Sequence, residues 1–337
     1  MNMKHYFSRM SVIVSMAILP SCAGDDIDKG LPLGSKIYNF DYQPKAGLIV
    51  ADYLEHTVRI LPDPIMRPKE KIEIKQVTVE GKPLPLNFAH AAVWLNESSF
   101  VLTLSKLNAD NPKLQGMILI VDAAARTAVR IDDIFADRKF QTFPAYAHPC
   151  GRGIAVSYAH LNALIVFDPN GEAVDLVGEK SRILPRLRPQ VAASLRNVID
   201  VPISNPHGIA CTDSAMFLAD TGHGRILRIQ SNGVSMLHRT GDILFAWRAG
   251  APAGPTFTSP VMVRTIDSAL YFNDESTGDL FKVDATAPID VPIEGTNWRF
   301  RTAPDEAPIK FFDFIRIDGG WLINLGTGGV IRRVRDS

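Results

Sequence analysis

The sequence predicts an all-β fold made of several small sheets of similar size that close into a ring. A unit of short apolar runs separated by turns recurs along the 337 residues, and its clearest copy runs from Asn205 to Ile229. The 24 glycines and 23 prolines are spread over the chain, which suits many short strands joined by turns rather than long helices. A repeat of about 40–50 residues is typical of a β-propeller, in which stacked blades bury faces that one sheet alone would expose.

Six copies of the unit align on one polar position, which we call the anchor residue. The residues two before and six after the anchor are apolar in the four clear copies, as expected for strands that face a buried layer. Successive anchors are 50 to 63 residues apart, so six units fill the chain beyond its first segment. The anchor residues are Asp52, Thr103, Ser157, Asp220, Asp274 and Asn324. We therefore predict a six-bladed β-propeller; a sandwich, the alternative all-β fold, does not predict a sixfold register.

The repeat also predicts the role of its anchors and the way the ring closes. Each anchor aspartate is expected to be structural, because a short acidic side chain accepts hydrogen bonds from backbone N–H groups of the following turn. The last unit ends at Val334 with three convincing strands. We expect Lys36–Phe40 to supply the missing strand, so that N- and C-terminal strands close the ring together.

The first residues are typical of a bacterial export signal. Lys4 and Arg9 carry positive charge before the apolar run Ser11–Leu19, which is too short to span a bilayer as a permanent helix. The sequence Leu-Pro-Ser-Cys that ends at Cys22 is similar to a lipobox, in which the cysteine is lipidated. We expect a periplasmic protein anchored by lipid to the outer membrane. The predicted organisation is a lipoprotein signal peptide at 1–22, a flexible tether at 23–35 and the propeller at 36–337.

The charge balance limits the classes of partner. The 36 basic and 36 acidic residues cancel, so no electrostatic signature of nucleic acid or anionic membrane binding is expected. A small molecule or an envelope protein is the expected partner, with membrane contact only through the lipid, and we expect a monomer.

Two features of the sequence leave alternatives open. Cys150 and Cys211 form a disulfide in an oxidising compartment or stay as two buried thiols. The basic segment Lys180–Asp200, with a possible short helix at its end, is a lid beside the channel mouth or a surface excursion that covers an edge.

Candidate site residues come from the blade register. Propellers place ligands at one end of the central channel, where the innermost strands begin, and three neutral imidazoles with an open fourth position form a catalytic zinc arrangement. Thirteen residues before the anchors lie Asn39, His90, His207, Val261 and Phe311, and His148 lies nine residues before its anchor. We expect His90, His148 and His207 to be ligands of a divalent metal, zinc or calcium, and Asn39, Val261 and Phe311 to line the channel. Alternatively, each histidine caps a loop by bonding to backbone carbonyls.

The clearest unit also resembles a known family. Its segments PHGIA (Pro206–Ala210) and ADTGHGRILRI (Ala219–Ile229) look like an NHL repeat, and the chain resembles the NHL and gluconolactonase (regucalcin-like) group of six-bladed propellers. Gluconolactonases of this group hold a divalent cation with a Glu, an Asn and an Asp. Here the early Glu-Gly-Pro is missing and His207 replaces the Asn of Pro-Asn-Gly. The residues for calcium-dependent lactone hydrolysis are therefore incomplete.

A second resemblance concerns the histidines. Peptidyl-hydroxyglycine amidating lyases are six-bladed propellers that use channel histidines as zinc ligands, and their repeats carry a similar Pro-His-Gly. The resemblance implies a zinc-ligand role for His207 and, by position, for His90, whereas His148 is about four residues out of register. Three hypotheses follow: a metal-dependent hydrolase or lyase, a non-catalytic scaffold that binds an envelope protein, and a sensor or carrier of a small ligand.

Overall fold

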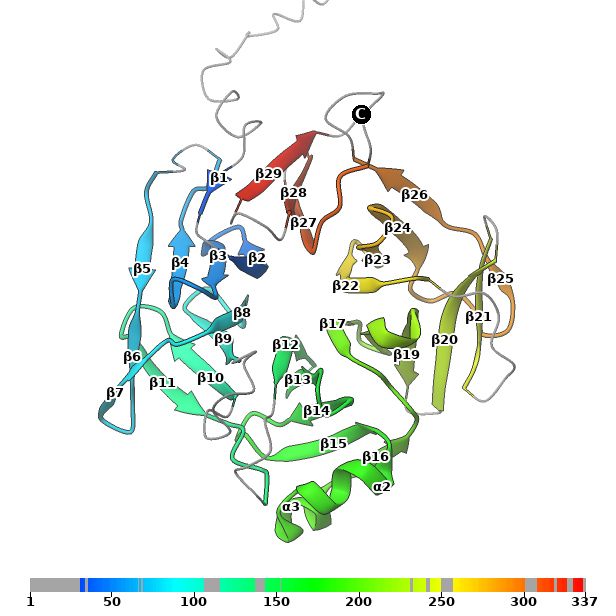
Figure 1. The fold of residues 1–337 in the computed structure, drawn as a ribbon, viewed down its shortest axis with the longest axis horizontal. Coiled ribbons are helices and arrows are strands. Elements are labelled where there is room, and N and C mark those ends of the chain that lie inside the picture. The colour runs from blue at the N-terminus through cyan, green and yellow to red at the C-terminus, as the bar shows by residue number, and fades with distance from the viewer. Residues whose placement is uncertain are drawn as a thin grey trace, which may run out of the picture.

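Six small sheets are arranged in a ring around a common centre, as Figure 1 shows. The computed structural model describes residues 31–33, 36–65, 67, 69–105, 116–136, 143–151, 153–230, 233–240, 243–249, 257–300, 308–317, 320–325 and 330–335. The predicted signal peptide and its Cys22 lie outside these residues. The six-bladed β-propeller predicted from the anchor spacing is confirmed.

Every blade has the same order of strands, counted outward from the channel. The innermost strands are β2 (Ile37–Gln43), β8 (Ala89–Trp94), β12 (Pro144–Cys150), β17 (Pro206–Cys211), β22 (Pro260–Ile266) and β27 (Asp313–Ile317). The second strands are β3 (Gly47–Asp52), β9 (Ser99–Leu104), β13 (Gly153–Tyr158), β18 (Met216–Asp220), β23 (Ala269–Asp274) and β28 (Gly320–Asn324). The third strands are β4 (Thr57–Leu61), β10 (Met117–Asp122), β14 (Ala163–Phe167), β19 (Arg225–Gln230), β24 (Asp279–Asp284) and β29 (Val330–Arg335).

The outer strands differ more between blades. The fourth strands are β5 (Ile72–Ile74), β11 (Thr127–Arg130), β15 (Ala173–Gly178), β20 (Gly233–Thr240), β26 (Thr296–Arg299) and β1 (Leu31–Pro32). Additional strands extend three blades: β6 (Gln76–Val79) and β7 (Lys82–Pro85) the second, β16 (Asn197–Asp200) the third, and β21 (Ile243–Arg248) and β25 (Pro292–Ile293) the fourth. The second strands are almost wholly buried, because both of their faces pack against neighbouring blades.

The anchor residues lie at or next to the ends of the second strands and act as structural ties. Asp52 Oδ1 accepts hydrogen bonds from the backbone N–H groups of Leu54 and Glu55, at 3.1 and 3.0 Å. Asp274 Oδ1 accepts a hydrogen bond of 2.9 Å from the backbone N–H of Ser276, two residues further along the chain. Asp52 and Asp274 therefore hold the turn that follows their strand, as the sequence predicted, whereas Asp220 accepts its backbone hydrogen bond from Ser204, which precedes the blade.

The ring closes with a different segment from the one predicted. Strand β1 pairs antiparallel with β29 and completes the sixth blade, although Leu31–Pro32 belongs to the stretch expected to be a tether. The expected closing stretch, Lys36–Phe40, instead lies mostly in β2 and pairs with β3 as the innermost strand of the first blade. The prediction that Lys36–Phe40 closes the ring is wrong. The first blade needs this stretch for its innermost strand, and the two residues of β1 are enough to complete the sixth blade.

Two open alternatives are resolved by the structure. Cys150 and Cys211 form a disulfide that joins the far ends of β12 and β17, with 5.5 Å between their Cα atoms. The basic segment forms α2 (Lys180–Ile183), the 3₁₀ turn η1 (Leu184–Arg186) and α3 (Pro189–Ser194) before β16 pairs in parallel with β15. Figure 1 shows these helices on the outer rim of the third blade. The segment is therefore an edge cover and not a lid.

No helix among the described residues is long and apolar enough to cross a membrane.

A buried ion cluster joins the blades on either side of the closure. The Arg264 guanidinium on β22 donates hydrogen bonds to Asp313 at the start of β27, at 2.9 to 3.1 Å, and to Asp41 on β2, at 3.2 Å. It also donates a hydrogen bond of 2.6 Å to the carbonyl of Phe40. The N–H of Phe40 in turn donates a hydrogen bond of 3.0 Å to Asp313 Oδ2. Burial opposes the charge of Arg264, but the charges of Asp313 and Asp41 outweigh it and raise the pKa of the arginine. One side chain thus ties the fifth, sixth and first blades.

We expect Arg264→Met to lower the free energy of unfolding by about 3–5 kcal/mol, because it leaves the buried Asp313 and the partly buried Asp41 without their counter-charge. Denaturation with urea measures the loss. The matched control is Lys45→Met, which breaks the exposed pair with Glu97, whose side chains are 76% and 57% exposed. This control should cost less than about 1 kcal/mol. Equal losses in the two variants would contradict a special role for Arg264.

Candidate functional site

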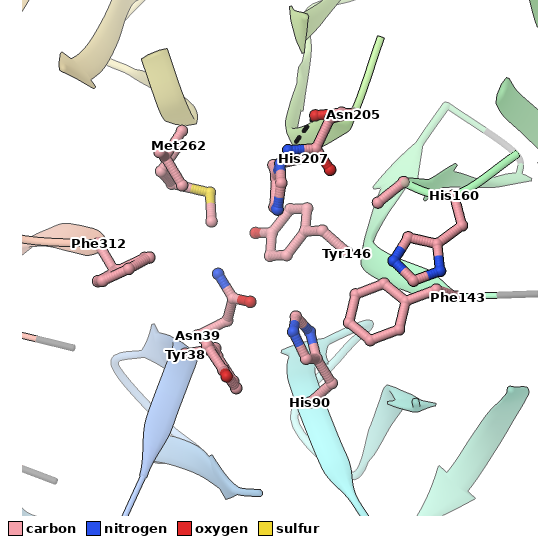
Figure 2. A pocket seen from close by; sticks show the side chains of 12 residues that line it. Tyr38, Asn39, His90, Phe143, Tyr146, His160, Asn205, His207, Met262 and Phe312 are labelled. Atoms are coloured by element: carbon pink, nitrogen blue, oxygen red, sulfur yellow. Dashed lines mark hydrogen bonds between the residues drawn. The ribbon is translucent and has the colours of Figure 1, made fainter. Parts of the chain in front are cut away.

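A cavity of about 130 Å³ lies at the end of the channel where the innermost strands begin. Its lining combines polar and aromatic side chains from several blades, and within the described part of the chain no acidic or basic residue other than histidine lines it. The lining residues are Tyr38, Asn39, His90, Phe143, Tyr146, Ala159, His160, Asn205, His207, Val261, Met262 and Phe312. Figure 2 shows the labelled side chains gathered around this space.

β-Bulges aim these side chains into the channel. In five blades the pairing of the innermost and second strands shifts by one register step near the start of the innermost strand. His90 lies in the bulge of the second blade, between Ala89 and Ala91, and His207 lies in the bulge of the fourth. A bulge removes its residue from the regular ladder and re-aims the side chain, so the irregularity that disturbs the sheet builds the site.

His90 is fixed in one orientation and one tautomer. Its imidazole is 4% exposed, stacks on the Tyr38 ring at 4.5 Å and meets the edge of Phe143 at 4.9 Å. Its Nδ1 lies 2.7 Å from the carbonyl oxygen of Ala145. A carbonyl only accepts, so Nδ1 carries the proton and Nε2 carries the lone pair. Burial, together with the nearby His207, lowers the pKa of His90 to about 3 and keeps the ring neutral.

His207 is held in the same way from the neighbouring side. Its Nδ1 lies 2.9 Å from the carbonyl oxygen of Asn205 and 3.2 Å from the hydroxyl of Thr221, which in turn donates 2.7 Å to the carbonyl of Pro260. Nδ1 is therefore the donor, and Figure 2 shows the other ring nitrogen pointing into the cavity. Burial lowers the pKa of His207 as well. Two neutral imidazoles thus present acceptor nitrogens to one space.

Tyr146 provides a further polar group at the base of the site. Its ring is buried, and its hydroxyl finds no hydrogen-bond partner among the described residues. Burial raises the pKa of Tyr146, against the charge of Arg264, so the hydroxyl keeps its proton. A buried hydroxyl without a partner costs free energy, which a ligand in the cavity would recover.

The structure brings together some of the predicted site residues and not others. His90, His207, Asn39 and Val261 line the cavity. His148 does not: it lies two residues beyond Tyr146 along β12, and its buried Nδ1 has no hydrogen-bond partner among the described residues. Phe311 packs against Phe300 and Phe314, and its neighbour Phe312 lines the cavity instead.

The described residues do not form the three-histidine arrangement expected of a zinc centre. No group of three or more His, Cys, Asp or Glu side chains in the described part of the chain is placed to hold a metal ion. The cavity does contain a third histidine, His160, which the register could not reveal because it follows the second strand of its blade. It stacks on Phe143 at 5.1 Å and is exposed.

No protein-family model matches the chain, and no curated protein matches it in sequence. Virginiamycin B lyase from Staphylococcus aureus is similar in structure, with 12% identity, a TM-score of 0.53 and coverage of 90% of this chain and 85% of the lyase. A Bacteroides thetaiotaomicron protein of unknown function has 11% identity and a TM-score of 0.54 over 89% of this chain and 69% of its own. The similarity is one of fold.

A more distant enzyme has the same fold. Hydrazine synthase of Kuenenia stuttgartiensis is 9% identical, with a TM-score of 0.50 over 89% of this chain and 84% of that one. At such identities the neighbours support the six-bladed propeller and carry no activity over to this chain. The finer resemblance to the NHL and gluconolactonase group has no support from these matches.

The depressed pKa of His90 predicts how stability changes with pH. An unfolded chain protonates this imidazole below about pH 6.5, whereas the folded protein resists until about pH 3, so stability present at neutral pH is lost as pH falls between these values. We expect the free energy of unfolding to fall less between pH 7 and pH 4.5 in His90→Gln than in the wild type, by about 2–3 kcal/mol. Urea denaturation at both pH values measures it. His160→Gln, at an exposed position, is the control, and parallel losses in His90→Gln and wild type would refute the assignment.

Proposed function

We propose that this chain is an exported ligand-binding propeller that holds a small ligand in the cavity between His90 and His207. The observation that carries the proposal is the pair of imidazoles whose Nδ1–H groups are tied to backbone carbonyls and whose second nitrogens face one cavity. Such fixed acceptors, set among aromatic side chains, are the features of a preformed small-molecule site. The hydrolase or lyase alternative needs a third metal ligand of the usual type, which the described residues do not supply.

The cavity restricts what an organic ligand can be. Its volume of about 130 Å³ admits a group the size of a small ring, since a cavity of about 150 Å³ accepts benzene. Among the described residues, the lining offers the imidazoles of His90, His207 and His160, the hydroxyls of Tyr38 and Tyr146 and the amides of Asn39 and Asn205, and it includes no acidic, lysine or arginine side chain. An organic ligand with O–H or N–H donors at two positions fits this pattern.

Binding of benzene, phenol and resorcinol tests the site, because the three probes carry zero, one and two O–H donors on one ring. We expect each added donor to strengthen binding several-fold, in line with a hydrogen bond worth about 1 kcal/mol. Shifts of the imidazole Cε1–H signals of His90 and His207 in NMR titrations measure it. His207→Phe should lose part of the preference for resorcinol, whereas His223→Phe, outside the cavity, should keep it. Equal binding of the three probes, or no shift, counts against the site.

Export and lipidation of Cys22 form the second part of the proposal. The basic start, the apolar run and the lipobox-like sequence support it, and the Cys150–Cys211 disulfide is typical of proteins in oxidising compartments. Labelling of growing bacterial cells with radioactive palmitate tests it. We expect label on the wild type, none on Cys22→Ala, and undiminished label on Cys150→Ala. Label that persists in Cys22→Ala would overturn the assignment.

A further inference from the structure

We propose that the ligand of this cavity is monovalent copper, Cu(I), held by Nε2 of His90, Nε2 of His207 and the thioether sulfur of Met262. The inference rests on the proposed function, since it names the ligand of the same site. It replaces the divalent zinc or calcium that the sequence suggested with an ion of softer chemistry.

Met262 supplies the soft ligand. It lies on β22, is fully buried, and lines the cavity together with both histidines. Its backbone N–H donates a hydrogen bond of 2.8 Å to the Asn273 side chain within the bulge of the fifth blade. This hydrogen bond fixes the position of Met262. Figure 2 shows its sulfur turned toward the space that the His207 ring faces. Thioethers select Cu(I), and imidazoles also suit copper, so two imidazoles and one thioether form a donor set for this ion.

The backbone keeps His207 and Met262 close together. Gly208 follows the histidine, and a Cβ atom built on it would lie 2.7 Å from the Cα of Met262 and from the N of Val263. Only glycine permits this approach of β17 to β22. The glycine of the Pro-His-Gly segment is thus explained as the residue that sets one ligand strand directly against the other.

The imidazoles are arranged as metal ligands usually are. In metalloproteins a ligating histidine commonly donates its other ring N–H to a backbone carbonyl or a carboxylate, which fixes tautomer and ring direction. His90 does so to Ala145 and His207 to Asn205. The three ligands come from β8, β17 and β22, three innermost strands, so the site stands on rigid elements.

The charge of the lining favours a monovalent ion. No carboxylate or thiolate among the described residues lines the cavity, so a bound cation meets uncharged ligand groups there. The Born cost of taking an ion out of water grows with the square of its charge, so an ion of charge one costs about a quarter of an ion of charge two. Calcium and magnesium, which take oxygen ligands, do not fit this donor set.

Cu(I) titration of the full-length protein, purified from membranes in mild detergent, tests the proposal. Copper is supplied with ascorbate under anaerobic conditions in competition with bicinchoninate, so that the disulfide is not reduced, and a thiol count on the same sample checks this. We expect one Cu(I) per chain, and binding at least tenfold weaker in Met262→Leu, which keeps the side-chain volume nearly unchanged. Met216→Leu on β18, outside the cavity, is the matched control and should bind as the wild type does.

X-ray absorption of the copper-loaded protein gives an independent readout. We expect nitrogen and sulfur neighbours in the wild type and in Met216→Leu, and loss of the sulfur neighbour in Met262→Leu. Wild-type Cu(I) affinity in Met262→Leu, no sulfur neighbour in the wild type, or binding no tighter than in the double variant His90→Gln, His207→Gln would overturn the proposal. If resorcinol shifts the histidine NMR signals but Cu(I) does not bind, the copper proposal is wrong and the proposed function stands. If neither resorcinol nor Cu(I) binds, both proposals are wrong.

Discussion

The contact between Arg264 and Asp313 is the interaction on which the ring depends. Ring closure between the first and last blades holds a propeller together. Here the N-terminal part of the chain contributes a strand of only two residues, β1, to the last blade. The pair bridges the fifth and sixth blades, and the bonds of Arg264 to Asp41 and Phe40 extend it to the first. Two buried charges and the partly buried Asp41 meet at this point, so the cluster stabilises the ring only while it is complete. The cost of disrupting it opposes any opening of the ring between these blades.

The same cluster sets the floor of the site. Arg264 lies two residues beyond Met262 on β22, and Asp41 lies two residues beyond Asn39 on β2. The ligand positions and the ion cluster therefore form successive layers along these two innermost strands. Tyr146 lies between these layers: it lines the cavity, and its pKa responds to Arg264 below. The position of the cavity walls is therefore fixed by the ions that hold the blades together.

The sequence revealed most of the fold because each blade repeats one pattern in one register. All six anchors fall on second strands, and counting back from them found His90 and His207. The count failed where the local pairing differs. In the sixth blade β27 and β28 pair without a bulge, with Asp313 opposite Asn324, so the inner strand starts later relative to its anchor and Phe312 replaces Phe311. No composition or periodicity signal marks the absence of a bulge.

His148 and Met262 show the two ways in which sequence reasoning missed the chemistry. His148 is of the right type but lies about four residues along β12 from the predicted position, which is about 13 Å at 3.3 Å per residue. Met262 lies at the right height, one residue from Val261, yet a thioether counts as apolar in any hydropathy pattern and is taken for core. Whether its polarizable sulfur can bind a metal depends on which side chains lie beside it. Those neighbours are supplied by the curvature of the ring and by the close approach at Gly208, so the donor set is a property of the closed fold and not of any one blade.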